Sequence, residues 1–163
     1  MLHRAGLENL PADIWQMTIM NYLFLNGNKL KSVPAGIGLL IKLKMLFIAN
    51  NELSYLAPEI GRLKVLEELD LSYNQLTELP DEIGQLSSLR ILRLNNNKLA
   101  ELPASIMGIE SLVELDVSNN GCLLYIPQSI NLLGNLETLI VDESTVFQIP
   151  FRPSNPRLEI IVK

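Results

Sequence analysis

Apolar residues recur along this 163-residue chain with a period of 23 positions. The stretch that begins at Leu66 aligns with the stretch that begins at Leu89, and the same pattern begins at positions 20, 43, 112 and 136. Written as LxxLxLxxNxLxxLPxxIGxLxx, each unit has apolar residues at its fourth and sixth positions, which predict a short strand. The proline at position fifteen ends the strand-forming stretch and suits the first turn of a short helical or 3₁₀ segment.

One unit therefore forms one coil, with a strand on one side and a short helical segment on the other. A single coil cannot bury its leucines, so the coils are expected to stack. Glycine is expected where the returning chain is crowded, at Gly38, Gly61 and Gly84. We expect a single domain over residues 1–163, with a half unit at 1–19, repeats that start at 20, 43, 66, 89, 112 and 136, and a capping strand at 158–163.

Asparagine occupies the ninth position of five units: Asn28, Asn51, Asn74, Asn97 and Asn120. A buried amide at this bend needs hydrogen-bond partners, and the backbone groups of its own and neighbouring coils are the nearest ones. We therefore expect a ladder of asparagines that ends at Ala5 and Ser144.

The pattern resembles the leucine-rich repeat family over almost the whole chain, and its LPxxIGxL form resembles the 23-residue, intracellular Ras-group type. The resemblance implies an α/β solenoid that is curved, with a parallel β-sheet on the concave face and short helical or 3₁₀ segments on the convex face. It also implies a protein-binding surface, with a small GTPase or a phosphatase subunit as partner by analogy only.

Composition narrows the partner class. The net charge of -5 and the scattered lysines and arginines argue against nucleic acid and against an anionic membrane surface. No apolar run reaches the 18 or so residues of a membrane span, and the start lacks the apolar region of a signal peptide. The single cysteine, Cys122, is expected to be a small apolar residue in a one-residue insertion, where Gly121 eases the turn. These features predict a cytoplasmic protein.

No catalytic or metal-binding arrangement emerges from the residue types. The only histidine, His3, lies at the terminus, and the repeat explains the GxG at Gly36 and Gly38. The acidic pairs Glu67–Glu68 and Asp142–Glu143 are expected to keep the sheet soluble rather than to bind a cation. We therefore expect no enzyme activity, no cofactor and no metal.

The variable strand positions are predicted to point to the concave side in three rows. The third positions are Tyr22, Met45, Glu68, Ile91, Glu114 and Thr138; the fifth are Phe24, Phe47, Asp70, Arg93, Asp116 and Ile140; the seventh are Asn26, Ala49, Ser72, Asn95, Ser118 and Asp142.

Two groups in these rows are candidate partner-binding residues. Tyr22, Phe24, Met45 and Phe47 form an exposed apolar patch, and such patches usually mark a partner site; the alternative is that a missing coil covers them. The row Asp70, Arg93 and Asp116 alternates in charge and is either a polar rim with Arg93 as a contact or a salt-bridge ladder. If the concave face is not the site, exposed apolar residues of the convex side are the next candidates: Trp15, Leu39 and Ile41.

At the other end, the segment FRPSNP around Pro153 is expected to stay extended, and residues 158–163 to cap the last coil, with Ile160 or a neighbour partly exposed. The interpretation is a non-catalytic interaction module that is monomeric or associates weakly through its terminal strands. The alternative is the recognition arm of a larger enzyme or effector whose activity lies outside this chain.

Overall fold

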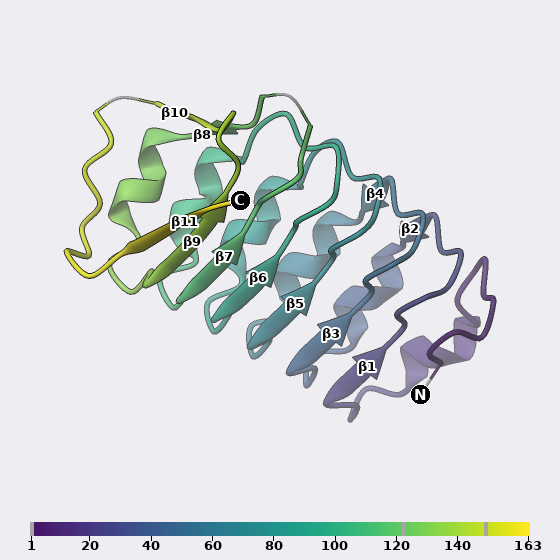
Figure 1. Cartoon of the computed structure of the whole chain (residues 1–163). Helices are drawn as coiled ribbons and strands as arrows, with labels where there is room; N and C mark the ends of the chain where they lie inside the picture. Colours follow the sequence, from purple (N-terminus) through teal and green to yellow (C-terminus); the bar gives the residue numbers. More distant parts are fainter. Residues whose placement is uncertain (1, 122, 149) are drawn as a thin grey trace.

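Seven short parallel strands lie side by side in chain order and form one curved sheet (Figure 1). The computed structural model describes residues 2–121, 123–148 and 150–163. Within them the sheet contains β1 (Tyr22–Phe24), β3 (Met45–Phe47), β5 (Glu68–Asp70), β6 (Ile91–Arg93), β7 (Glu114–Asp116), β9 (Thr138–Val141) and β11 (Glu159–Val162). The two termini lie at opposite ends of this array (Figure 1). Each strand pairs only with the strands of adjacent coils, as in other repeat proteins.

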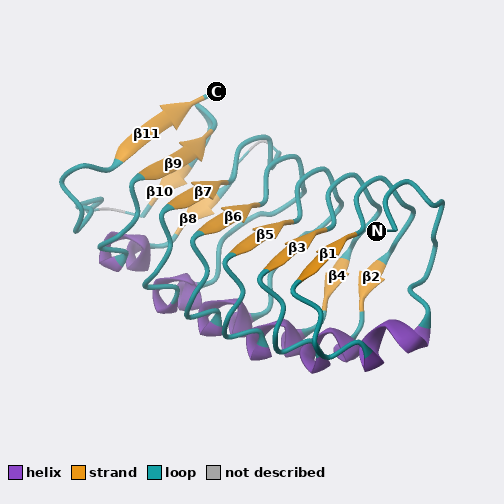
Figure 2. Ribbon diagram, turned by 90° about the horizontal axis from the view of Figure 1, so that it is seen from below, coloured by secondary structure: helices purple, strands orange, loops and turns teal. Residues whose placement is uncertain are grey.

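Short 3₁₀ helices line the opposite side of the molecule from the sheet (Figure 2). They are η1 (Ala12–Gln16), η2 (Ala35–Leu39), η3 (Pro58–Arg62), η4 (Asp81–Gln85), η5 (Ala104–Gly108) and η6 (Gln128–Leu132). Proline directly precedes most of them, as the repeat predicts, and η3 instead has Pro58 inside its first turn. The Ile and the Leu that stand three residues apart in the repeat face inward, as in η4, where Ile83 and the following Leu86 are fully buried.

Two minor sheets, which were not predicted, form where the chain passes from the main sheet to the helices. They pair β2 (Ser32–Val33) with β4 (Tyr55–Leu56), and β8 (Tyr125–Ile126) with β10 (Val146–Phe147). In β2 and β8 these are the two residues that precede the proline at position fifteen. A residue before proline is driven towards extended backbone, which explains the pairing.

The glycines of the helical segments allow neighbouring coils to approach closely. A Cβ atom at Gly61 would lie 2.6 Å from the carbonyl oxygen of Glu82, and one at Gly84 would lie 2.1 Å from that of Ser105. Neither distance leaves room for a methyl group beside a backbone atom. The predicted crowding at these positions is therefore confirmed.

The asparagine ladder is also confirmed, and its bonds run to backbone groups of adjacent coils. Asn51 Nδ2 donates to the carbonyl oxygens of Leu25 and Ile48, while its Oδ1 accepts from the N–H of Leu30. At the N-terminal end, Asn28 Oδ1 accepts from the N–H groups of Ala5 and a second residue of the half unit, Leu7. The half unit thus supplies the hydrogen-bond donors for Asn28, the asparagine at the N-terminal end of the ladder.

Each ladder asparagine follows a residue with left-handed backbone. These residues are Gly27, Asn50, Tyr73, Asn96 and Asn119, with φ between 53° and 72°. Glycine and asparagine adopt this conformation readily, whereas tyrosine does so rarely. At the insertion, Gly121 has φ of 95°, which confirms its role in the turn; Cys122 lies outside the described residues.

The C-terminal strand caps the last coil as predicted, but in a register one residue away from the repeat alignment. Aligning Leu158 with Leu136 would place Ile161 opposite Leu139. Instead Ile160 lies opposite Leu139, so Ile160 and Val162 take the core-facing positions. The strand remains exposed, with Val162 at 55%, because only one face of it has a neighbour. The preceding segment around Pro153 forms no helix, as expected.

Candidate functional site: the concave face

The predicted rows of side chains exist on the concave sheet. Tyr22, Met45 and Glu68 are register partners along the third positions, and Phe24, Phe47 and Asp70 along the fifth. Neighbouring strands lie about 4.8 Å apart, so residues within a row touch. The sheet therefore brings side chains that are 23 residues apart in sequence into contact.

The apolar patch is formed by Tyr22, Phe24, Met45 and Phe47. The rings of Phe24 and Phe47 stack, with centroids 5.1 Å apart and planes 18° from parallel. Tyr22 is 53% exposed, whereas Phe24, Met45 and Phe47 are half-buried. The patch is therefore less exposed than predicted at three of its four residues, and the stack covers part of each phenylalanine ring.

An apolar groove continues the patch at the N-terminal end of the solenoid. Its volume is about 460 Å³, and it is lined by Leu2, Ile14, Met17, Met20, Tyr22, Leu23 and Phe24. Tyr22 and Phe24 belong to both the groove and the patch. The apolar surface thus extends from the concave face around the edge of β1.

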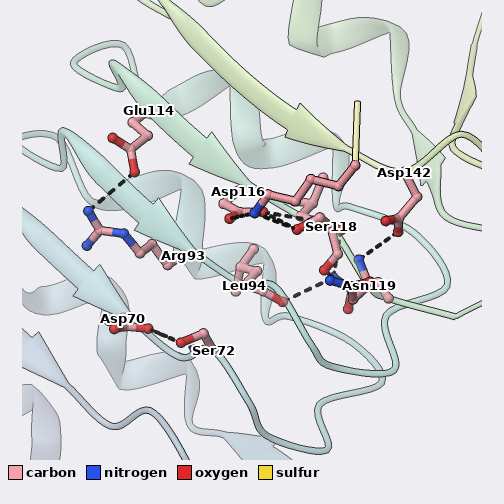
Figure 3. Close-up of polar contacts among 12 residues, drawn as sticks. Asp70, Ser72, Arg93, Leu94, Glu114, Asp116, Ser118, Asn119 and Asp142 are labelled. Carbon is pink, nitrogen blue, oxygen red and sulfur yellow. Dashed lines mark hydrogen bonds and ion pairs between the residues drawn. The ribbon is translucent and has the colours of Figure 1, made fainter. Parts of the chain in front are cut away.

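Arg93 lies at the centre of the face, and its ion pairs run diagonally rather than along its own row. It pairs with Glu68 on one neighbouring strand. On the other strand it pairs with Glu114 at 3.3 Å (Figure 3). The predicted ladder through Asp70 and Asp116 is therefore wrong in its partners. Burial alone lowers the pKa of Arg93, but the hydrogen bond to Glu68 and the surrounding carboxylates outweigh it and raise that pKa above the ordinary value.

The two aspartates of the row instead accept hydrogen bonds from serines two residues further along the chain. Asp70 Oδ1 accepts from the hydroxyl of Ser72 at 2.6 Å, and Asp116 Oδ1 accepts from that of Ser118 at 2.6 Å (Figure 3). Asp116 also pairs with Lys163 of the C-terminal segment at 3.0 Å.

Burial corrects two further expectations for this face. Asp116 is only 6% exposed, so it is not open to a partner as predicted. Three of the seventh-position residues are buried rather than concave-facing: Ala49, Ser72 and Ser118. These positions lie two residues beyond the ends of their strands, where the chain turns towards the core.

Among residues 2–121, 123–148 and 150–163, no group of three or more His, Cys, Asp and Glu side chains is placed to hold a metal ion. The acidic pairs are engaged elsewhere, since Glu67 pairs with Lys44 at 3.2 Å and Asp142 accepts from the N–H of Asn119. His3 is exposed near the terminus. Within the described part of the chain, no helix is long and apolar enough to cross a membrane.

The convex side differs from its prediction at one position. Leu39 and Ile41 are exposed, as expected. Trp15 is half-buried, because its ring lies against the backbone of Gly36, where a Cβ atom would be 2.6 Å from the indole. Trp15 is thus a packing residue between the first two coils.

Sequence reasoning missed Lys163, Ser72 and Glu114 as parts of the site. Ser72 and Glu114 stand in the rows, but nothing in their spacing distinguishes a serine that holds an aspartate from a plain surface residue. Lys163 reaches Asp116 from 47 positions away. The alternation of charge in the rows was the only signal that pointed to this region.

Comparison with known proteins agrees with this architecture. The family described as leucine-rich repeat region matches residues 60–148, and a second leucine-rich repeat family matches residues 18–76. No curated protein matches the chain at a significant level.

Three solved structures illustrate the likeness. A leucine-rich repeat protein of Leptospira interrogans is 34% identical, with a TM-score of 0.85, over 96% of this chain and 40% of that one. The plant peptide hormone receptor RGFR1, solved in complex with RGF2, is 31% identical, with a TM-score of 0.79, over 94% of this chain and 26% of that one. An internalin of Listeria monocytogenes shares the fold. It is 17% identical, with a TM-score of 0.71, over 96% of this chain and 51% of that one.

The chain spans less than half the length of the first two relatives. Leucine-rich repeat modules commonly mediate protein–protein interaction. With a matching family over more than half of its residues and a parallel sheet backed by 3₁₀ helices, the chain belongs to the leucine-rich repeat family.

Proposed function

We propose that this chain is a non-catalytic interaction module that binds a segment of a partner protein on its concave face. The observation that carries the proposal is the Phe24–Phe47 stack, which lies on the solvent side of the sheet although the core is already filled by the leucines beneath it. Contiguous apolar groups on a solvated sheet usually mark a partner site. Aromatic side chains are also enriched among residues that dominate binding energy.

Charge and shape support the same location. The apolar patch is bordered by the Arg93 cluster on one side and by the 460 Å³ groove on the other. A binding surface with an apolar centre and a polar margin is typical of protein interfaces. Two similar structures were solved as complexes, which supports a protein or peptide partner here. The plant receptor RGFR1 was solved with RGF2, and the receptor kinase ectodomain GASSHO1/SCHENGEN3 of Arabidopsis thaliana was solved with Casparian strip integrity factor 2.

The finer assignment is part of the proposal. The 23-residue LPxxIGxL spacing favours the Ras-group type, which suggests a small GTPase or a phosphatase subunit as partner, a scaffolding role in signalling and a cytoplasmic location. These points rest on the form of the repeat.

Two tyrosines of equal exposure allow a direct test. Tyr22 lies in the apolar patch and Tyr55 lies in β4, away from the concave sheet; both are 53% exposed. A photo-crosslinking amino acid is placed at either position, and the crosslinked proteins from the native cell are identified by mass spectrometry. We expect one dominant partner from position 22, lost in the Phe24→Ser, Phe47→Ser double variant. Crosslinking from position 55 alone would show that another face binds.

A further inference from the structure

The same Asp-x-Ser motif occurs twice, two repeats apart, where β5 and β7 end. In the first copy, the N–H and the hydroxyl of Ser72 both donate to Asp70 Oδ1, at 3.0 and 2.6 Å. In the second copy, Ser118 donates to Asp116 Oδ1 through the same two groups at the same distances. Each serine thereby fixes its carboxylate and leaves the second oxygen, Oδ2, available to another group.

The second copy holds a lysine ammonium group. Lys163 Nζ lies 3.0 Å from Asp116 Oδ2 and 3.3 Å from Ser118 Oγ. Because Ser118 uses its hydroxyl hydrogen on Asp116, its oxygen remains free to accept from the ammonium group. The Asp-x-Ser motif at Asp116 and Ser118 therefore binds a lysine ammonium group of its own chain.

The first copy shares Arg93 as a register neighbour with the second, but it holds no such ligand among the described residues. Asp70 and Asp116 are the two register neighbours of Arg93, whose guanidinium is turned to Glu68 and Glu114 instead. Among the described residues, no lysine or arginine nitrogen lies within 4.0 Å of the Asp70 carboxylate. Asp70 is half-buried and reachable from solvent, whereas Asp116 is covered.

We propose that Asp70 and Ser72 form a subsite for the ammonium group of a lysine side chain of the partner. The inference rests on the proposed function and adds the chemistry of the ligand to it. Phe47 is the register neighbour of Asp70, so the subsite borders the Phe24–Phe47 stack. A partner segment that places an apolar side chain on the stack sets its lysine about one strand spacing, ~4.8 Å, further along the row. The net charge of -5 favours such a cationic segment.

The test uses peptide probes and the full chain. The ¹⁵N-labelled protein is titrated with an acetylated and amidated Phe-Gly-Lys peptide and, separately, with the same peptide carrying Nε-acetyl-lysine. We expect the amide signal of Ser72 to shift with the lysine peptide, with binding weakened about three- to tenfold by acetylation. Asp70→Asn keeps an oxygen that can accept the Ser72 hydrogen bonds. This variant should bind the lysine peptide only as tightly as the unaltered chain binds the acetylated peptide.

Lys163→Met supplies the matched control, because it empties the second copy of the motif. The amide of Ser118 should respond to the lysine peptide only in this variant. The subsite is overturned if Ser118 responds in Lys163→Met while Ser72 does not respond in the unaltered chain. It is also overturned if the two peptides bind equally well, or if neither peptide binds. The crosslinking test at Tyr22 does not depend on these probes, so failure of the subsite and failure of the concave-face function are separable.

Discussion

The Oδ1 atom of Asn74 accepts a hydrogen bond of 3.0 Å from the N–H of Leu53, which lies 21 residues earlier in the adjacent coil. The Nδ2 atom of the same side chain donates to the carbonyl oxygen of Ile48, in that coil, and to that of Leu71, in its own, at 3.0 Å each. One amide thus joins two coils at the bend where neither backbone completes its own hydrogen bonds.

Asn74→Ala should therefore destabilise the fold, because it leaves buried backbone groups without partners. We expect the free energy of unfolding, measured by urea denaturation, to fall by about 1–3 kcal/mol. Asn95→Ala is the control, since the half-buried side chain of Asn95 makes no hydrogen bond with the described residues and should change stability little. An Asn74→Ala protein that unfolds like its parent would show that water replaces the ladder.

Gly84→Ala tests the contact between neighbouring helical segments. The added methyl group would meet the carbonyl oxygen of Ser105 at 2.1 Å, so η4 and η5 must move apart. Overpacking of this kind costs about 1–3 kcal/mol, which thermal unfolding would detect. Gly134→Ala is the matched change, because a Cβ atom there meets nothing within 4 Å, and it should leave the melting temperature unchanged or slightly higher. Equal effects of the two changes would contradict this view of the packing.

The regular part of the fold could be predicted from the sequence because every repeat makes the same local choice. The rows of the sheet follow from the 23-residue period, and the buried asparagine at each bend admits only backbone partners. The register of β11 could not be predicted, since Ile160, Ile161 and Val162 are all aliphatic and either alternation buries apolar side chains.

The polar part of the site was less accessible to sequence reasoning. Whether Arg93 pairs along its row or diagonally depends on side-chain rotamers, which spacing does not encode. The burial of Asp116 depends on Lys163, at the far end of the chain, and on the register of the strand that carries it. Contacts of this kind arise only after the coils have stacked.

Removing the C-terminal cap should expose the last coil. Deletion of residues 156–163 uncovers Leu139 and Val141, which are buried beneath β11 in the intact chain. Loss of their burial corresponds to about 3 kcal/mol, and the exposed sheet edge favours association. Light scattering should detect aggregates, whereas Lys163→Ala, which keeps β11, should remain as dispersed as the parent. A monomeric deletion variant with unchanged melting would remove the capping role.

Arg93→Gln probes the charged centre of the concave face. The change leaves Glu68 and Glu114 on either side without their shared cation, so it should cost up to about 1 kcal/mol at low salt. The cost should shrink towards zero near 1 M salt, where the screening length falls to about 3 Å. Lys44→Gln, which breaks a more exposed pair with Glu67, should change stability by only a few tenths of a kcal/mol. A loss that is independent of salt would assign Arg93 a packing role instead.

The methyl group of Met45 offers the most direct test of the concave face as the binding surface. Met45 lies in the apolar patch, whereas Met107 is exposed on η5 of the convex side. The chain is labelled with ¹³C at its methionine methyl groups, and the partner identified by crosslinking is added. Our account predicts that the Met45 signal shifts or broadens on binding while the Met107 signal stays in place. A shift of Met107 with no change at Met45 would contradict it and assign the partner to the convex side.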